Sequence, residues 1–270
     1  MKEIYNALIL GIKDYFEKNE ISKAVIGLSG GLDSSVVAYL AVKAIGKENL
    51  IGILMPDSVT SKESIKDAKK VAKGLGIKHD IIPIEGFMEV FDKINTNVEL
   101  NDLSAIANVK ARTRMIILYY LAQINNAFVL GTSDKSEIAL GYTTKYGDNA
   151  SDLLVIGDLW KTEVFKLGKF LGIPSSILKK KPSAELILGQ TAEKELGASY
   201  HVLDRILKLY IENDFSSKEI KDNGFKKELV LNVVKRIKSN EHKRRAPVII
   251  RLSERSFHNK DWRMPITNRF

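Results

Sequence analysis

The sequence predicts an α/β fold, a doubly wound parallel sheet flanked by helices, and three observations lead to this prediction. Short β-rich runs occur at residues 24–29, 51–55, 80–84 and 127–131. Helical apolar spacing separates them at 33–45, 61–74 and 104–125. The runs and the helical segments alternate along the chain, which indicates strands that are covered by helices on both faces. Strands that alternate with helices form a parallel sheet between two helical layers.

An amphipathic helix is expected before the first strand, and mainly helices are expected after the sheet. Apolar residues at Ile4, Leu8, Ile12 and Phe16 predict the first helix. After the last strand come polar stretches at 141–152 and 179–195, which we expect to be surface loops, and helices near 161–171, 199–213 and 225–239. We therefore expect a single domain over 1–270, with a core at about 20–172 and a helical, basic C-terminal part at 173–270.

Composition excludes several classes of function. The 270 residues contain no cysteine, so this chain has no disulfide, no cysteine-ligated metal site and no cysteine nucleophile. A hydrophobic share of 44% with 28% charged residues is ordinary for a globular chain that buries a substantial core.

The charge of +9 is concentrated near the C-terminus. From Lys235 onward there are eleven Lys or Arg against three Asp or Glu, so the first 234 residues are nearly neutral. Residues 1–20 mix charged with apolar side chains and lack a small-residue cleavage site, unlike a signal peptide. No apolar run approaches the roughly 20 residues that cross a bilayer. We expect a cytoplasmic protein without membrane contact.

The segment GLSGGLDSS at 27–35 is the most informative motif. Gly30 and Gly31 allow the backbone N–H groups of a strand-to-helix loop to surround an anion at a helix N-terminus. Asp33 places a carboxylate where a phosphate-bound Mg²⁺ needs one. An ordinary strand–helix turn, with Asp33 as a first-turn acid, is the structural alternative.

The loop is not a Walker A motif, because it lacks the lysine that reaches the β- and γ-phosphates. SGGLDSS instead resembles the signature loop of the N-type ATP pyrophosphatases. That resemblance implies an adenine nucleotide alpha-hydrolase-like fold, and cleavage of ATP between its α- and β-phosphates.

Five further segments resemble NAD synthetase, in that family's order. They are NVKARTRM (108–115), GTSDKSEIALGYTTKYGDNASD (131–152), LGIPSSILKKKPSAEL (171–186), GQTAEKELGASY (189–200) and EHKRRAP (241–247). The resemblance implies a ligase of NAD biosynthesis that adenylates the carboxylate of deamido-NAD with ATP. Ammonia then displaces AMP, giving NAD.

The resemblance also implies which residues bind ATP and its metal. The ATP-binding set is Gly27, Leu28, Ser29, Gly30, Gly31, Leu32, Asp33, Ser34, Thr132, Lys161 and Ser183. Asp33 and Glu137 are the implied Mg²⁺ ligands. Glu137 has a structural alternative, because Asp134-x-x-Glu137 also fits a capping box. At Ser183 the family usually has threonine, which keeps the hydroxyl.

A second set is implied to bind deamido-NAD: Arg112, Lys145, Asp152, His242 and Lys243. Helical spacing places Arg112 on one face with Asn108, Met115 and Tyr119. A solvated helix face is the alternative for Arg112, as is a solvated basic run for His242 and Lys243. Asp152 is expected to orient substrate or to deprotonate ammonia. Asp33, Glu137, Asp152 and Lys161 form the expected catalytic set.

Nitrogen is expected to arrive as free ammonia, or from a separate ammonia-supplying protein. Longer family members carry an N-terminal glutaminase domain with a cysteine nucleophile. Here the signature loop begins about two dozen residues into a chain without cysteine. By resemblance we expect a homodimer, and the apolar face of the 104–125 helix is either a candidate contact or part of the buried core.

Two other functions are compatible with the loop. One is an RNA-modifying ATP pyrophosphatase that adenylates a tRNA base and uses the basic tail as its RNA contact. The other is a nucleotide-binding module without catalysis. Because the five matches favour a dinucleotide, no nucleic-acid partner is expected.

Overall fold

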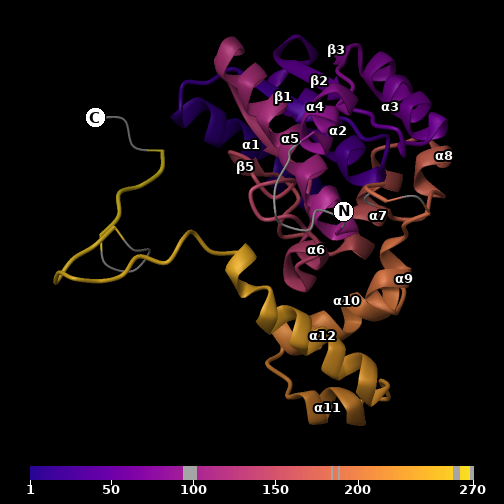
Figure 1. The fold of residues 1–270 in the computed structure, drawn as a ribbon, viewed down its shortest axis with the longest axis vertical. Coiled ribbons are helices and arrows are strands. Elements are labelled where there is room, and N and C mark those ends of the chain that lie inside the picture. Colours follow the sequence, from indigo (N-terminus) through magenta and orange to yellow (C-terminus); the bar gives the residue numbers. More distant parts are fainter. Residues whose placement is uncertain (94–101, 184, 188, 258–261, 268–270) are drawn as a thin grey trace.

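The fold is a five-stranded parallel sheet with helices on both faces, as the sequence predicts (Figure 1). The computed structural model describes residues 1–93, 102–183, 185–187, 189–257 and 262–267. The strands are β1 Lys23–Gly27, β2 Leu50–Leu54, β3 Lys78–Ile81, β4 Ala127–Gly131 and β5 Leu153–Leu154. Their order is β3-β2-β1-β4-β5, and every neighbouring pair is parallel.

Helices precede, separate and follow the strands. The helices of the sheet region are α1 Lys2–Lys18, α2 Leu32–Ile45, α3 Lys62–Leu75, α4 Glu85–Asp92, α5 Leu103–Asn125, α6 Lys135–Leu140 and α7 Lys161–Phe170. The later ones are α8 Ser175–Leu178, α9 Ala192–Leu196, α10 Tyr200–Ile211, α11 Ser217–Asp222 and α12 Lys227–Ser239. Short 3₁₀ turns lie at Lys47–Asn49 and Glu241–Lys243.

Alternate side chains of the strands fill two separate cores. Ala24 and Ile26 of β1 face a large cluster with α1, α2 and α7. Val25 faces the opposite side, with Val129 of β4 and Ile117 of α5. Burial on both faces explains why the central strands β1, β2 and β4 are almost entirely apolar.

Several elements differ from the prediction. β3 covers 78–81 rather than 80–84, and β5 was not predicted because it has only two residues. Four short helices, α4, α8, α9 and α11, were also missed, each eight residues or fewer, whereas α6 begins at the capping box that the sequence offered at Asp134. α9 lies partly within the segment 179–195, which we expected to be a loop. Such lengths carry too few turns for an apolar period to be recognised.

The C-terminal helices form a third apolar cluster below the sheet region (Figure 1). α10 contributes Tyr200, Leu203, Ile206 and Leu207 from one face. These residues pack with α12 and with Leu140 of α6, the helix that follows β4. Beyond Arg244, the described chain continues as an extended tail that lies away from the sheet (Figure 1).

Along the described ranges, no helix combines the length and the apolar character needed to cross a bilayer.

The variant Leu203→Ala is expected to lower the free energy of unfolding by about 2–5 kcal/mol, because Leu203 is fully buried and its truncation leaves a cavity. Urea denaturation measures the change. His201→Ala, an exposed position on the same helix, is the matched control. Equal stability of the two variants would contradict the proposed contribution of this cluster.

Candidate active site

The loop between β1 and α2 lies at the carboxyl end of β1, where strand order reverses between β2 and β4. In such sheets this crevice is the usual ligand site. The N–H of Leu28 donates to the carbonyl of Ile53 at 2.8 Å, which extends the β1–β2 pairing. The N–H of Gly31 donates to Ser29 Oγ at 3.1 Å, and Ser35 Oγ donates to the Gly31 carbonyl at 2.7 Å. The loop is therefore held by its own hydroxyls at the start of α2.

Gly30 permits the loop to pack closely against α3. Its φ of +78° lies in the left-handed region, and a Cβ there would approach the Ser64 carbonyl oxygen to 2.1 Å. Lys180 also joins the loop to α3. Its ammonium donates to the Gly30 carbonyl at 3.3 Å and pairs with Asp67 Oδ2 of α3 at 2.9 Å. The glycine is thus required by backbone conformation and by space.

Three carboxylates converge on the buried ammonium of Lys161. Its Nζ lies 2.9 Å from Asp33 Oδ2, 2.7 Å from Asp134 Oδ2 and 2.8 Å from Glu137 Oε1. Lys161 is 1% exposed and Asp134 is fully buried. The cluster joins the first turns of α2, α6 and α7, so residues 128 positions apart in the chain meet at one point.

Asp134 and Glu137 have the structural role that the capping box predicts. Asp134 accepts from the N–H of Glu137 at 2.9 Å, and Glu137 Oε2 accepts from the N–H of Asp134 at 3.3 Å. The other oxygen of Glu137 faces Lys161. Capping and participation in the cluster therefore coexist, because each uses a different carboxylate oxygen.

Burial and mutual repulsion change the acidity of the cluster. Burial, and then the neighbouring Asp134, raise the pKa of Glu137 well above its usual value. Burial also raises the pKa of Asp134 to about 6. Burial disfavours the charge of Lys161, but Asp134, Asp33 and Glu137 outweigh it and raise the ammonium pKa well above normal. Three acids around one base leave excess negative potential that favours a cation.

The donor set fits a magnesium ion that is shared with a phosphate ligand. Asp33 Oδ1 is buried without a hydrogen-bond partner. Since Asp33 and Glu137 both contact Lys161 Nζ, their contacting oxygens are at most about 5.7 Å apart. Among the described residues, no three His, Cys, Asp or Glu side chains are arranged so that they could hold a metal ion by themselves. Mg²⁺ commonly uses one or two protein carboxylates and completes its shell with water and phosphate oxygens.

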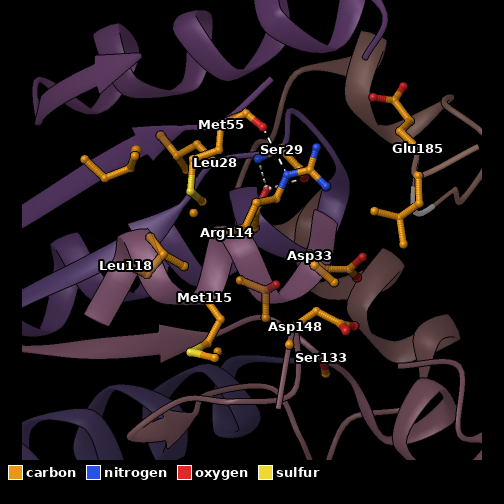
Figure 2. Close-up of a pocket in the computed structure, with 18 of the residues that line it drawn as sticks. Leu28, Ser29, Asp33, Met55, Arg114, Met115, Leu118, Ser133, Asp148 and Glu185 are labelled. Atoms are coloured by element: carbon orange, nitrogen blue, oxygen red, sulfur yellow. Dashed lines mark hydrogen bonds between the residues drawn. The ribbon is translucent and has the colours of Figure 1, made fainter. Parts of the chain in front are cut away.

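Two neighbouring cavities adjoin the loop. The larger, of about 260 Å³, is shown in Figure 2. Of the predicted residues, Gly27, Leu28, Ser29, Asp33, Ser34, Thr132, Glu137 and Ser183 line it. The smaller, of about 110 Å³, is lined among others by Ser29, Gly31, Leu32, Asp33, Lys161 and Ser183. Gly30 lies in the same loop, so the structure brings the whole predicted ATP set together.

The residues predicted to bind deamido-NAD lie outside the lining of both cavities, around the segment 141–152. Arg112 is exposed and its Nε donates to the Lys145 carbonyl at 3.3 Å. Lys243 Nζ donates to the carbonyls of Gly141 and Thr143 at 2.7 and 2.8 Å. Gly147, Asp148 and Ala150 of this segment line the larger cavity, so the two predicted sets are contiguous.

The predicted face of α5 packs on this same segment. Asn108 Oδ1 accepts from Thr144 Oγ1 at 2.7 Å, and the hydroxyl of Tyr119 lies 3.5 Å from Asp152 Oδ1. Burial, and then the charge of Asp152, raise the pKa of Tyr119 to about 12. Asp152 Oδ2 accepts from the N–H of Val129 at 2.7 Å, so this carboxylate also holds β4. The segment 141–152 is thus held against α5 and β4 by hydrogen bonds.

His242 lies at the surface with Nδ1 3.0 Å from the carbonyl of Ser239. Its neighbour Arg244 donates through Nη1 to the carbonyls of Ile138 and Ala139, both at 3.0 Å. The basic run therefore hydrogen-bonds to the last carbonyl groups of α6 as well as contributing positive charge.

Sequence reasoning missed the lining residues Arg114, Asp148 and Glu185, and the loop anchor Lys180. Arg114 stands two positions after Arg112 and so points away from it on the helix. Asp148 and Glu185 lie in polar segments that have no period to follow. The one signal was that Arg114 belongs to the same matched segment, NVKARTRM, as the predicted ligand Arg112.

Comparison with known proteins identifies the family. The NAD synthase family model matches residues 4–247. The chain is 46% identical over 284 residues to a glutamine-dependent NAD(+) synthetase of Thermotoga maritima, covering all of this chain and 48% of that protein. It is 45% identical over 249 residues to an NH(3)-dependent NAD(+) synthetase of Methanocaldococcus jannaschii, covering 92% and 96% of the two chains.

A solved structure shares the fold along its full length. The NMN synthetase of Francisella tularensis superposes with a TM-score of 0.80 at 32% identity, covering 93% of this chain and 98% of that one. The chain spans about half the length of the glutamine-dependent relatives it matches. The signature loop, the ordered segments, the fold and these matches agree, and the chain belongs to the NAD synthase family.

Proposed function

We propose that this chain is an NAD synthetase that amidates deamido-NAD with ammonia at the expense of ATP, releasing NAD, AMP and pyrophosphate. The observation that carries the proposal is the convergence of the Ser29–Ser35 loop and the Lys161 carboxylate cluster on one pair of cavities. Such a site suits a nucleoside triphosphate with a divalent cation. Family membership supplies the reaction class.

The first step is adenylation. An oxygen of the deamido-NAD carboxylate attacks the α-phosphorus of ATP, and the bond between that phosphorus and the oxygen bridging to the β-phosphate breaks. The Ser29–Ser35 loop holds the departing pyrophosphate through backbone N–H groups and hydroxyls, and Lys161 places positive charge beside it. The carboxylate oxygen is thereby converted into part of a good leaving group.

The second step is attack by ammonia on the activated carbonyl. A tetrahedral intermediate forms, a proton is lost from nitrogen, and AMP departs as the amide forms. Water must be excluded because it would hydrolyse the adenylate. Segment 141–152, fastened to α5 by Asn108 and to the tail by Lys243, supports this role by closing one side of the larger cavity.

Mg²⁺ would be held by Asp33 and Glu137, and when bound it would neutralise phosphate charge that develops during adenylation. The Lys161 ammonium lies between these two carboxylates. This contact supports the assignment, because both side chains already converge on a positive charge.

Arg112, Lys145, His242 and Lys243 are proposed to bind deamido-NAD next to the ATP site. Their contiguity with the larger cavity through segment 141–152 supports this. For Asp152 we propose an orienting role rather than deprotonation of ammonia. One of its oxygens is engaged with the backbone of β4, and the other faces Tyr119.

We propose ammonia itself as the nitrogen substrate, either free or released by a separate protein. The match with the NH(3)-dependent relative over 96% of that protein supports direct use, and the chain holds no cysteine for glutamine hydrolysis.

We also propose that residues 1–270 act as one domain, since α7 packs against both the sheet region and α10. The co-substrate ATP favours a cytoplasmic location.

We further propose a homodimer through α5. Ile116, Tyr120 and Ile124 form an exposed apolar stripe at four-residue spacing, in line with Arg112. Exposed apolar stripes of this kind commonly mark protein interfaces. A contact here would bring the deamido-NAD site close to the subunit boundary.

The direct test is formation of NAD, AMP and pyrophosphate from ATP, ammonium and an acceptor. Deamido-NAD, nicotinate mononucleotide and bulk tRNA are supplied in parallel. NAD formation with deamido-NAD and ammonium is expected, with no product from glutamine alone. AMP release that depends on tRNA, with binding that weakens steeply as salt increases, would instead establish the RNA-modifying alternative. Nucleotide binding without any product would indicate a non-catalytic module.

Asp33→Ala is expected to reduce pyrophosphate release at least a hundredfold, because it removes a proposed metal ligand at the loop. The melting temperature is expected to remain within a few degrees of the unmodified protein, since Lys161 keeps Asp134 and Glu137 as partners. Asp158→Ala removes an exposed carboxylate that pairs with Lys135 and serves as control. Undiminished turnover in Asp33→Ala would refute the metal assignment.

Tyr120→Asp is expected to shift the protein from dimer to monomer, because it places a charge in the centre of the α5 stripe. Sedimentation velocity measures the change. Leu231→Asp, at an exposed apolar position on α12, is the control and should leave the dimer intact. A dimer that is unaffected by Tyr120→Asp would place the contact elsewhere.

A further inference from the structure

The two cavities at the loop differ in their charge. They share the lining residues Ser29, Asp33, Pro182, Ser183 and Glu185, so they meet beside the start of α2. The smaller one is lined by three lysines, Lys161, Lys180 and Lys181. In the larger one the carboxylates are Asp33, Glu137, Asp148 and Glu185. Among its described lining residues, Arg114 is the only Lys or Arg.

The distribution of donors suggests how ATP would lie along these cavities. The N–H and hydroxyl groups of the loop and the three lysines gather around the smaller cavity, which suits the two phosphates that leave as pyrophosphate. The nucleoside must then extend into the larger cavity, whose apolar lining includes Leu28, Met55 and Leu118. The α-phosphate consequently lies near the junction of the cavities, between Ser29 and the nucleoside.

Arg114 lines the larger cavity and is held there in a fixed orientation. Its Nε donates to the carbonyl of Met55 at 3.0 Å, and its Nη2 lies 3.6 Å from Asp57 Oδ2. Asp57 is itself buried and fixed by Lys110 at 2.9 Å and by the hydroxyl of Thr60 at 2.8 Å. In Figure 2 the guanidinium extends from α5 into the space between Met55 and Ser29.

The guanidinium retains binding capacity toward the cavity. The contacts with Met55 and Asp57 use Nε and Nη2, and Nη1 has no hydrogen bond to any residue that the structure describes. A planar, permanently charged group with free donors matches the oxygens of a phosphate. The anchored side chain loses little additional freedom when it binds one, because its orientation is already set.

We propose that Arg114 binds the α-phosphate of ATP and holds the AMP half of the nucleotide, while the lysine-lined cavity takes the pyrophosphate. This inference rests on the proposed adenylation reaction. When the acceptor oxygen bonds to the α-phosphorus and the bond to the bridging oxygen breaks, negative charge shifts onto pyrophosphate. The non-bridging α-oxygens remain with Arg114 through adenylate formation and until AMP departs.

The test measures binding of adenosine, AMP and pyrophosphate separately, by calorimetry with Mg²⁺ present. Arg114→Gln keeps a donor for the Met55 carbonyl but loses the charge, and it is expected to weaken AMP binding about ten- to a hundredfold. Affinities for adenosine and for pyrophosphate should stay within about twofold. Arg114→Lys, which restores the charge without the fork, should bind AMP with intermediate affinity.

Arg205→Gln is the matched control, because it removes the charge of an exposed arginine on α10 that lines neither cavity. It should retain AMP affinity. The inference is overturned if Arg114→Gln binds AMP normally, if adenosine affinity falls in parallel, or if Arg205→Gln loses AMP affinity equally. Failure of the adenylation proposal has a different signature, in which the unmodified protein binds neither AMP nor pyrophosphate.

Discussion

The site depends on one interaction, the burial of the Lys161 ammonium among three carboxylates. A buried charge is tolerated only when it is paired and hydrogen-bonded, and here each carboxylate comes from the first turn of a helix or its N-cap. Asp33 belongs to α2, Asp134 and Glu137 begin α6, and Lys161 begins α7. The electrostatic requirement of one side chain thus aligns three helices at the edge of the sheet.

The C-terminal helices contribute to this arrangement although they lie away from the sheet. Asp204 of α10 is buried, accepts from Ser136 Oγ at 2.6 Å and accepts from the N–H of Thr162 at 2.8 Å. Ser136 Oγ in turn accepts from the N–H of Lys161 at 2.9 Å. The apolar cluster of α10 and α12 therefore sets the start of α7, and with it the position of Lys161.

If the loop binds phosphate as we propose, cationic side chains from other segments take the place of the lysine that it lacks. Lys161 and Lys180 come from segments more than 120 residues beyond the loop, and Arg114 comes from α5. Each is held by a buried acid, respectively Asp134, Asp67 and Asp57. Such pairing keeps long cationic side chains in place at the cost of desolvation, which a bound triphosphate offsets by adding negative charge.

The sequence by itself determined the parallel α/β architecture, the signature loop and the family. The apolar runs of the strands, the helical period and the order of the motifs can all be read along the chain without knowledge of its packing. It also predicted the capping box at Asp134 and the shared face of Asn108, Arg112, Met115 and Tyr119. Only the tertiary structure decided the rest. β5 has two residues, and the anchoring of Asp152 to Val129 depends on a contact between distant segments. The meeting of Lys161 with Asp33, and the position of Arg114 between Met55 and Asp57, likewise depend on packing, since no sequence period links residues so far apart.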